Sequence, residues 1–266
     1  MAFNKRFLWV VIASAIAAMF GIMGFCLPWR NVFVPSASGE SIRILSCNTH
    51  GQVLQIGRLA ELIDAAKPDV VVLQEWTQPA DCALFKNGDW TVVTNGEMLL
   101  ATRFHVESFG EVENAAAVHY TLKTPGGNVD LFNVHFASPH FPLRDVVIGR
   151  ENGRADLEMN IRRRRDESRE VIRTAGPMTD PVLIAGDFNL CPDSPIFRDN
   201  FGNYRDAFAA CGFGFGWTYR SRWTALRIDH ILARGWIVCR ACWLGPDVGS
   251  LHRPLIADYL VPAGDR

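Results

Sequence analysis

The apolar run Val70–Leu73 limits the possible fold of this chain more than any other feature. A strand of the sequence Val-Val-Val-Leu offers no polar side to solvent, which is typical of a central strand covered on both faces. The preceding stretch over about Gln55–Ala66 has apolar residues at helical spacing and ends at Lys67-Pro68. A further strand is expected at Ile42–Cys47. The chain therefore opens its globular part with a strand, a helix and a buried strand.

Strands also dominate the rest of the sequence. A long helix is expected over about Arg154–Thr174, with apolar residues at helical spacing. Further strands are expected at Thr91–Thr94, Met98–Thr102, Ala115–Lys123, Val129–Phe136, Val182–Ala185, Ile228–Ala233, Trp236–Trp243 and Leu255–Val261. The chain has 266 residues, of which 48% are hydrophobic, so it can bury a substantial core. Many strands and few helices predict an α/β fold in which two packed sheets are flanked by helices.

The segment 7–29 carries no charged residue and, as a helix, is long enough to cross a hydrocarbon core of about 30 Å. Lys5 and Arg6 precede it, which favours a cytoplasmic N-terminus. We expect residues 1–30 to form a transmembrane anchor, or alternatively a cleaved signal segment. A linker follows at 31–40 and one globular domain at 41–266. This domain is expected on the non-cytoplasmic side, and to be secreted if the segment is cleaved.

Polar residues follow several of the predicted strands directly, where a core would not select them. These positions are Asn48, Glu75, His135, Asp187 and Asn189. Two further polar motifs lie downstream, Arg-Ile-Asp-His with Asp229 and Ser-Leu-His-Arg-Pro with His252. Side chains at the ends of buried strands reach the rim of a sheet, where groups from different strands can meet. The sequence therefore predicts one polar cleft at a sheet edge.

These motifs, in this order, resemble those of the endonuclease/exonuclease/phosphatase superfamily. The Gly-Asp-Phe-Asn sequence at 186–189, together with the Asp-His and Ser-x-His-Arg-Pro motifs, is the most specific part. His135 matches the His-bearing branch, the deoxyribonuclease and sphingomyelinase type. The resemblance covers Ser41–Leu260 and implies a four-layer α/β/β/α sandwich, which agrees with the predicted elements.

The resemblance implies a metal-dependent phosphoric ester hydrolase in which water attacks a phosphodiester. Such chemistry needs a hard cation that neutralises developing charge. Glu75 is the expected carboxylate ligand of Mg²⁺, with Mn²⁺ as the alternative, and Asn48 is expected to assist through its carbonyl or to contact the phosphate.

The remaining roles are also implied by the resemblance. His252 is expected to act as the general base, with its tautomer fixed by Asp229. Asp187 and Asn189 would hold the water and the phosphate. His135 would stabilise the phosphate or protonate the leaving oxygen.

One position departs from the family pattern. The family usually has Asp directly before the last His, where this chain has Leu251. An apolar side chain cannot replace a carboxylate near the metal. This departure leaves a second hypothesis open, namely a catalytically weakened relative that binds a phosphate ligand.

The substrate stays open between nucleic acid, a phospholipid and a lipid-linked phosphate. The net charge of −1 provides no global attraction to nucleic acid. The loop Phe213–Trp223 combines aromatic residues with arginines, which could stack on bases, enter a membrane interface or cover the core. The tetrad Arg162–Arg165 is expected to be a solvated helix face, because successive helical positions point in different directions. A membrane contact is expected through the N-terminal helix, and no protein partner is implied.

Overall fold

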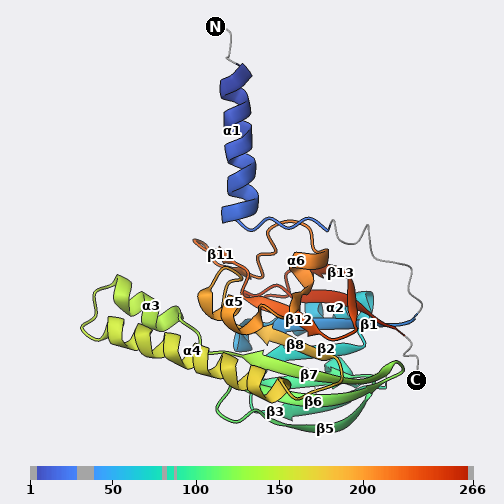
Figure 1. Cartoon of the computed structure of the whole chain (residues 1–266). Helices are drawn as coiled ribbons and strands as arrows, with labels where there is room; N and C mark the ends of the chain where they lie inside the picture. Colours follow the sequence, from blue (N-terminus) through green and yellow to red (C-terminus); the bar gives the residue numbers. More distant parts are fainter. Residues whose placement is uncertain (1–4, 29–38, 80–82, 87–88, 263–266) are drawn as a thin grey trace.

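Two six-stranded sheets form the body of the computed structural model, which describes residues 5–28, 39–79, 83–86 and 89–262 (Figure 1). In spatial order, the first sheet contains β13 (Val238–Leu244), β14 (Leu255–Pro262), β1 (Gly39–Asn48), β2 (Val70–Gln74), β4 (Met98–Thr102) and β3 (Thr91–Asn95). The second contains β5 (His105–Glu111), β6 (Ala117–Thr124), β7 (Gly127–His135), β8 (Val182–Asp187), β12 (Asp229–Arg234) and β9 (Arg205–Asp206). A separate hairpin consists of β10 (Tyr219–Arg220) and β11 (Ala225–Leu226).

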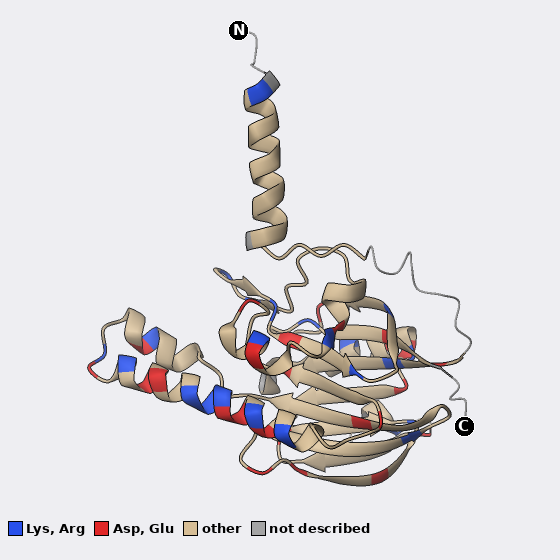
Figure 2. Cartoon of the chain, viewed as in Figure 1, with Lys and Arg blue, Asp and Glu red and all other residues tan. Residues whose placement is uncertain are grey.

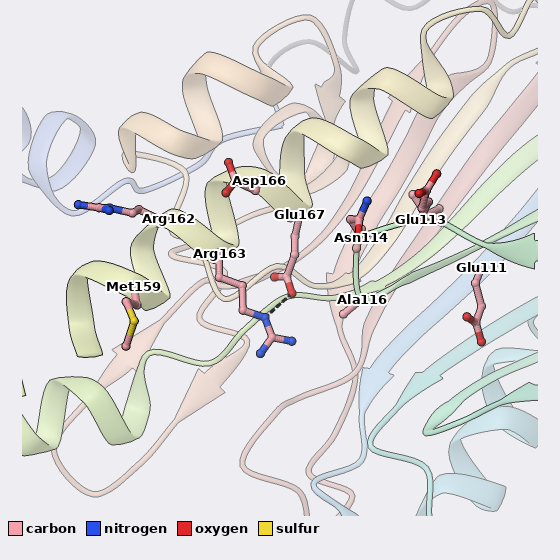
Figure 3. Close-up of a pocket in the computed structure, with 11 residues that line it drawn as sticks. Glu111, Glu113, Asn114, Ala116, Met159, Arg162, Arg163, Asp166 and Glu167 are labelled. Atoms are coloured by element: carbon pink, nitrogen blue, oxygen red, sulfur yellow. Dashed lines mark hydrogen bonds and ion pairs between the residues drawn. The ribbon is translucent and has the colours of Figure 1, made fainter. Parts of the chain in front are cut away.

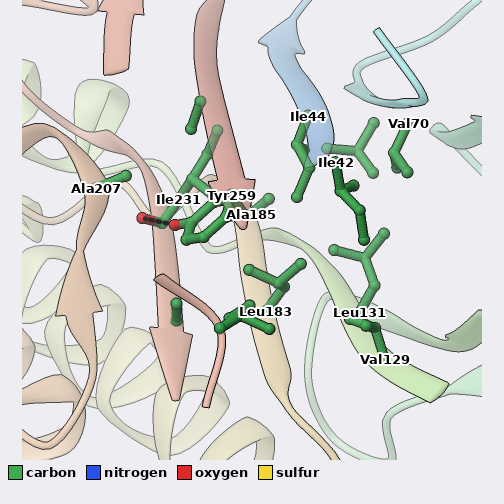
Figure 4. Packing of buried hydrophobic residues seen from close by; sticks show 14 of the residues in the cluster. Ile42, Ile44, Val70, Val129, Leu131, Leu183, Ala185, Ala207, Ile231 and Tyr259 are labelled. Atoms are coloured by element: carbon green, nitrogen blue, oxygen red, sulfur yellow. Dashed lines mark hydrogen bonds between the residues drawn. The ribbon is translucent and has the colours of Figure 1, made fainter. Parts of the chain in front are cut away.

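The main core lies between the two sheets. Ile44 and Val70 of the first sheet belong to the same buried cluster as Leu131 and Leu183 of the second, and Figure 4 shows part of this packing. Successive residues of a strand point to opposite faces, so Leu45, the neighbour of Ile44, packs on the outer side of its sheet. Alternate residues of each strand thus pack in two separate apolar layers, one between the sheets and one beneath the helices.

Helices cover both outer faces. On the first sheet, Leu59 and Ile63 of α2 (Ile56–Ala66) pack against outward-facing apolar residues of β1 and β2. On the second, α4 (Gly153–Ala175) and α5 (Pro195–Phe201) pack against β7 and β8. The layer order is helix, sheet, sheet, helix, as expected for an α/β/β/α sandwich.

The predicted strands and both predicted helices are confirmed, with small shifts at their ends. The structure adds elements that the sequence did not predict: the strand β5, the helices α3 (His140–Val147) and α6 (Ala207–Cys211), the helix α5, and 3₁₀ turns at Gly51–Val53 and Ala83–Phe85. β5 was missed because it is an edge strand with mainly exposed side chains, so it lacks an apolar alternation.

The N-terminal segment corrects one expectation. The regular helix α1 (Lys5–Ala17) has 13 residues, a length of about 20 Å, and continues as a π-helical turn, η1 (Ala18–Ile22). Within the described part of the chain, none of the helices combines the length and apolarity needed to cross a membrane. The transmembrane helix predicted within 7–29 is therefore not supported. The chain then returns to the body, where Cys26 pairs with Gly214 by backbone hydrogen bonds of 2.8 and 3.0 Å.

The predicted linker lies mostly outside the described residues. Only its last two residues, Gly39 and Glu40, are described, and they already belong to β1. The boundary of the globular domain stays a prediction.

Candidate functional site

The strand registers bring the predicted polar residues together at one edge of the two sheets. β1 and β2 run parallel, as do β7 and β8, so Asn48 and His135 both reach this edge at the ends of their strands. Glu75 directly follows β2, and Asp187 is the last residue of β8. β12 runs antiparallel to β8 and begins with Asp229 opposite Asp187. The edge predicted from sequence is therefore present, and its side chains are in contact.

Asn48 links the two sheets at this edge. Its buried Nδ2 donates to Glu75 Oε1 at 2.9 Å and to Asp187 Oδ2 at 3.0 Å. Its Oδ1 accepts a hydrogen bond from the backbone N–H of His50 at 2.9 Å. Glu75 has a left-handed backbone with φ of 51°, and the Thr49 hydroxyl donates to its carbonyl at 2.8 Å. A strained backbone that is held in this way is typical of functional positions.

Asp187 and Asn189 form a tight turn after β8. Oδ1 of Asp187 accepts the backbone N–H of Asn189 at 2.8 Å, and its Oδ2 accepts Asn189 Nδ2 at 3.2 Å. Asn189 has φ of 50°, and its Nδ2 also donates to the carbonyl of Phe136 at 2.8 Å. Burial and repulsion from Asp229 raise the pKa of Asp187 to about 6, although His252 opposes this shift. The site therefore concentrates negative charge.

Asp229 and His252 form an oriented pair. Nδ1 of His252 lies 3.1 and 2.9 Å from the two carboxylate oxygens of Asp229, which leaves its Nε2 facing Asp187 Oδ2 at 3.8 Å. Burial lowers the pKa of His252, but Asp229 and Asp187 outweigh this and raise it to about 9. The Ser250 hydroxyl accepts the backbone N–H of His252 at 3.0 Å and donates to the carbonyl of Asn48 at 2.7 Å. The histidine loop is thus fixed to the end of β1.

His135 lies next to Glu75 and Asp187. Its Nε2 is 3.5 Å from Glu75 Oε1 and 3.9 Å from Asp187 Oδ2. Its Nδ1 lies 2.8 Å from Glu97 Oε1, in the turn between β3 and β4. Burial lowers the pKa of His135, but the hydrogen bond to Glu97 and the nearby carboxylates raise it overall. The same hydrogen bond lowers the pKa of Glu97.

Comparison with known proteins identifies the family. A family model described as Endonuclease/Exonuclease/phosphatase family matches residues 45–250. The chain belongs to this family. Similar solved structures include the 3'-5' exonuclease NExo from Neisseria meningitidis, with 17% identity, a TM-score of 0.60, and coverage of 81% of this chain and 98% of that one.

Two other similar structures support the same fold. Humanized D. rerio TDP2 has 17% identity and a TM-score of 0.62 over 82% of this chain and 98% of that one. The human Nocturnin catalytic domain with a bound sulfate anion has 16% identity and a TM-score of 0.60 over 84% and 95%. These identities are low, so the likeness shows a shared fold. The search of curated proteins found no match to this chain.

The donor set of this family member fits a divalent cation. Among the described residues, Asp187, Asp229 and His252 each offer a ligand atom, and these atoms lie within 4.8 Å of one another. These three residues are not the ligands predicted from the sequence, which are Asn48 and Glu75. The two sets are neighbours, because Asn48 Nδ2 donates to both Glu75 and Asp187. The carboxylate oxygens of Asp187 and Asp229 suit Mg²⁺. Coordination by Asn48 would require its amide to turn, because Nδ2 rather than Oδ1 faces the carboxylates.

Two residues of α4 support the site and were missed by the sequence analysis. The buried Arg164 donates from Nη1 to the carbonyl of Asn189 at 2.7 Å. Glu167 Oε2 accepts the backbone N–H of Ala137, close to His135, at 2.9 Å. Helix α4 therefore holds both loops that carry site residues of the second sheet.

The arginine tetrad was accordingly only partly predicted. Arg162 and Arg165 are exposed, as expected for a solvated face, whereas Arg164 is turned inward. Figure 3 shows the neighbouring hollow between α4 and the turn after β5, where Arg163 pairs with Glu167 at 2.9 Å. The hollow is lined by charges of both signs, so it provides no uniform field for a charged ligand.

Leu251, which stands where the family usually has Asp, lies at the rim of the site. Its side chain is 38% exposed, whereas the neighbouring His252 is buried. Its carbonyl accepts the backbone N–H of Arg220 from the β10–β11 hairpin at 2.9 Å. His230, which alternates with Asp229 along β12, points away from the site and lies with Nε2 2.9 Å from the carbonyl of Leu190.

Proposed function

We propose that this protein is a divalent-cation-dependent phosphoesterase that hydrolyses a phosphodiester by in-line attack of water. The observation that carries the proposal is the oriented Asp229–His252 pair, whose free Nε2 faces the buried carboxylate of Asp187 within one polar cluster. Membership of the family supports the same class of reaction.

The chain's own residues supply a path for the proton. The attacking water gives its proton to Nε2 of His252 while its oxygen forms a bond to phosphorus and the bond to the leaving oxygen breaks. Asp229 orients the imidazole through Nδ1 and stabilises the imidazolium that forms. Asp187 accepts a hydrogen bond from the water, and Asn189 holds Asp187 in place.

In this proposal the leaving group lies near His135. His135, whose pKa is raised overall, is positioned to give a proton to the leaving oxygen. Glu75 and Asn48 are the proposed ligands of Mg²⁺ or Mn²⁺. When bound, the cation neutralises charge that develops on the phosphate and, by offsetting the neighbouring carboxylates, favours the neutral form of His252.

The proposed substrate is a phosphodiester in nucleic acid, in a phospholipid or in a lipid-linked phosphate. The similarity to NExo, a 3'-5' exonuclease, supports the first. The exposed aromatic residue Trp223 in the β10–β11 hairpin, near His252, suits either a base or a lipid interface.

The test uses the purified full-length chain in mild detergent, Mg²⁺ and bis(p-nitrophenyl) phosphate. Turnover that is lost on chelation and in His252→Ala supports the proposal. A panel of DNA, RNA, phospholipid and a phosphomonoester then distinguishes the substrates. Leu251 favours a second function: binding of inorganic phosphate without turnover of any substrate would indicate a phosphate-binding relative.

We also propose that the domain works outside the cytoplasm. Arg6 precedes an apolar segment whose side chains from Phe7 to Ile12 are exposed, which is a pattern typical of an export segment. Fusion of an alkaline phosphatase reporter to the C-terminus tests this, since that reporter is active only after export.

A further inference from the structure

Helix α3 exposes its apolar face. Every residue of α3 is exposed or half-buried, and it packs on α4 with Asp145 and Val146 turned inward. Phe141 is 62% and Val147 is 77% exposed, and Ile148 directly after the helix is also exposed. A surface helix normally buries its apolar residues and exposes its polar ones. In α3 and directly after it, several apolar residues are exposed instead, which marks an interaction surface.

The tip of the β10–β11 hairpin has the same chemistry. Trp223 is 85% exposed, and the guanidinium of Arg222 lies 5.0 Å from the centre of its ring. In α3, the guanidinium of Arg144 lies 5.2 Å from the ring centre of Phe141. Two separate elements thus each present an exposed aromatic ring with an arginine beside it.

Both elements are attached directly to the site. Helix α3 begins shortly after His135 at the end of β7. The hairpin forms a bridge from Tyr219 to His252, and the two rings lie 5.0 Å apart. In Figure 1 the hairpin and α3 both project from the left side of the sandwich, beyond the edge of the sheets. Each element therefore adjoins a segment that carries a site residue.

We propose that the outer face of α3 and the tip of the β10–β11 hairpin form a docking rim for an anionic phospholipid bilayer. The docking rim consists of Phe141, Arg144, Val147, Ile148, Arg222 and Trp223. Aromatic rings are favoured at the boundary between headgroups and acyl chains, and arginines pair with lipid phosphates and are attracted by anionic lipids.

The shape of the rim favours a bilayer over a protein. The exposed apolar side chains lie on two separate projections, α3 and the tip of the β10–β11 hairpin. A protein partner would need a matching pocket for each of them at the same spacing. A fluid interface accommodates both tips without such a match. The N-terminal segment points to the same occupant, because α1 exposes apolar side chains along its length and carries no charge after Arg6 (Figure 2). The packing of Phe25 against Phe213 and Phe215 connects this segment to the chain that leads into the hairpin.

Docking requires no hydrolysis, so it can be tested whether or not the proposed activity is found. The full-length chain is mixed with vesicles of phosphatidylcholine alone or with one quarter phosphatidylglycerol, and amide hydrogen exchange is followed by mass spectrometry. We expect exchange at 140–148 and 219–226 to slow by about tenfold or more on the anionic vesicles only, and the effect to vanish in high salt. Exchange in β5 should not change.

Variants separate the rim from α1, which remains present in all of them. In Phe141→Ser/Val147→Ser/Trp223→Ser and in Arg144→Glu/Arg222→Glu, the vesicle-induced protection at both tips should disappear. Phe109→Ser, at an aromatic residue on β5 that is 53% exposed, and Arg169→Glu on α4 are the controls and should retain it.

Three results would overturn the proposal: unchanged exchange at the tips on anionic vesicles, an equal effect on neutral vesicles, or protection in the controls and rim variants alike. Protection that appears without vesicles and rises with protein concentration would instead indicate a second copy of the chain as the occupant, which also overturns it. Turnover of bis(p-nitrophenyl) phosphate should be the same in Arg144→Glu/Arg222→Glu and the wild type, since this soluble substrate needs no membrane.

Discussion

The chain contains two buried polar clusters that share strand β12 but differ in how their charges are balanced. Asp229 and His230 are consecutive residues of β12, so their side chains point to opposite faces. Asp229 faces the site with Asp187 and His252, whereas His230 faces Asp206. In the site, burial and a neighbouring carboxylate raise the pKa of Asp187 to about 6.

In the cluster on the other side of β12, the negative charge of Asp206 is balanced by its neighbours. Asp206 Oδ1 caps α6 by accepting the backbone N–H groups of Phe208 and Ala209, at 2.9 and 3.2 Å. Its Oδ2 lies 3.1 Å from the guanidinium of Arg227 and 3.5 Å from His230 Nδ1. Burial raises the pKa of Asp206, but Arg227 and His230 outweigh it and hold the pKa well below its usual value.

The comparison teaches how to separate a functional cluster from a structural one. A group that only stabilises the fold has its charge matched by neighbours, and its ionised form is favoured. The proposed site, which would bind a cation and activate water, keeps carboxylates together without equal compensation, and one of them resists ionisation. Removing a side chain should therefore affect catalysis in the first cluster and stability in the second.

The largest expected effect is on turnover in His252→Ala. Loss of the proton acceptor should reduce kcat by about 10³-fold, while the melting temperature changes little. Steady-state kinetics with bis(p-nitrophenyl) phosphate and a thermal melt measure the two quantities. His119→Ala removes a histidine that pairs with Asp130 away from the site, and is the control. More than a tenth of wild-type turnover in His252→Ala would contradict the assigned role.

In the other cluster, Asp206→Asn should act on stability. Removal of one partner from a buried ion pair costs about 3–5 kcal/mol of unfolding free energy, while turnover per folded molecule is retained. Denaturant unfolding measures it, with Asp199→Asn on the exposed side of α5 as the control. A loss of turnover without a loss of stability would place Asp206 in the functional cluster instead.

The same variant predicts a pH dependence. The pKa of Asp206 is lower in the folded chain than its unfolded value of about 3.9, so its stabilisation is present above that pH and is lost as the pH falls through the folded-state pKa. The difference in unfolding free energy between wild type and Asp206→Asn should therefore shrink as the pH is lowered below about 4. A constant difference across this range would show that the carboxylate charge is not responsible.

A smaller effect on kcat is expected for Arg164 of α4, which supports a loop of the site. Arg164→Met removes the hydrogen bond to the carbonyl of Asn189, whose left-handed backbone holds Asp187. We expect kcat to fall about tenfold, as for the loss of one charged hydrogen bond, with KM nearly unchanged. Arg162→Met and Arg165→Met, exposed on the same helix, are matched controls. An equal decrease in all three variants would indicate a general effect on α4.

The sequence predicted the parts of the site that lie on strands. Asn48, His135, Asp187 and Asp229 stand at strand ends, and the registers of neighbouring strands align these ends in space. Local patterns carry this information because each residue directly ends or begins an apolar run.

The supporting residues could not be found in this way. Glu97 lies in a turn, and Arg164 is one of several consecutive arginines, so neither has a local signal that separates it from solvated neighbours. Their contacts depend on how α4 and the β3–β4 turn pack against distant strands. The helix α3 was missed for a different reason: it has only eight residues, too few for a helical pattern to stand out from the sequence around it.

The smallest expected effect concerns which part of the site holds the cation. Mg²⁺ at 100 times its Kd should raise the unfolding free energy by about 2.7 kcal/mol, which is a shift of several degrees in melting temperature. If Glu75 and Asn48 are the ligands, Glu75→Gln removes this shift, while the exposed Glu61→Gln on α2 retains it. If the cation is held by Asp187, Asp229 and His252 instead, Glu75→Gln keeps most of the shift and Asp187→Asn removes it. The carboxylates of Glu75 and Asp187 contact the same amide of Asn48, so a cation that bridges them would lose its stabilising effect in both variants. If both variants kept the shift in melting temperature, the unbalanced charge of this cluster would not serve a metal.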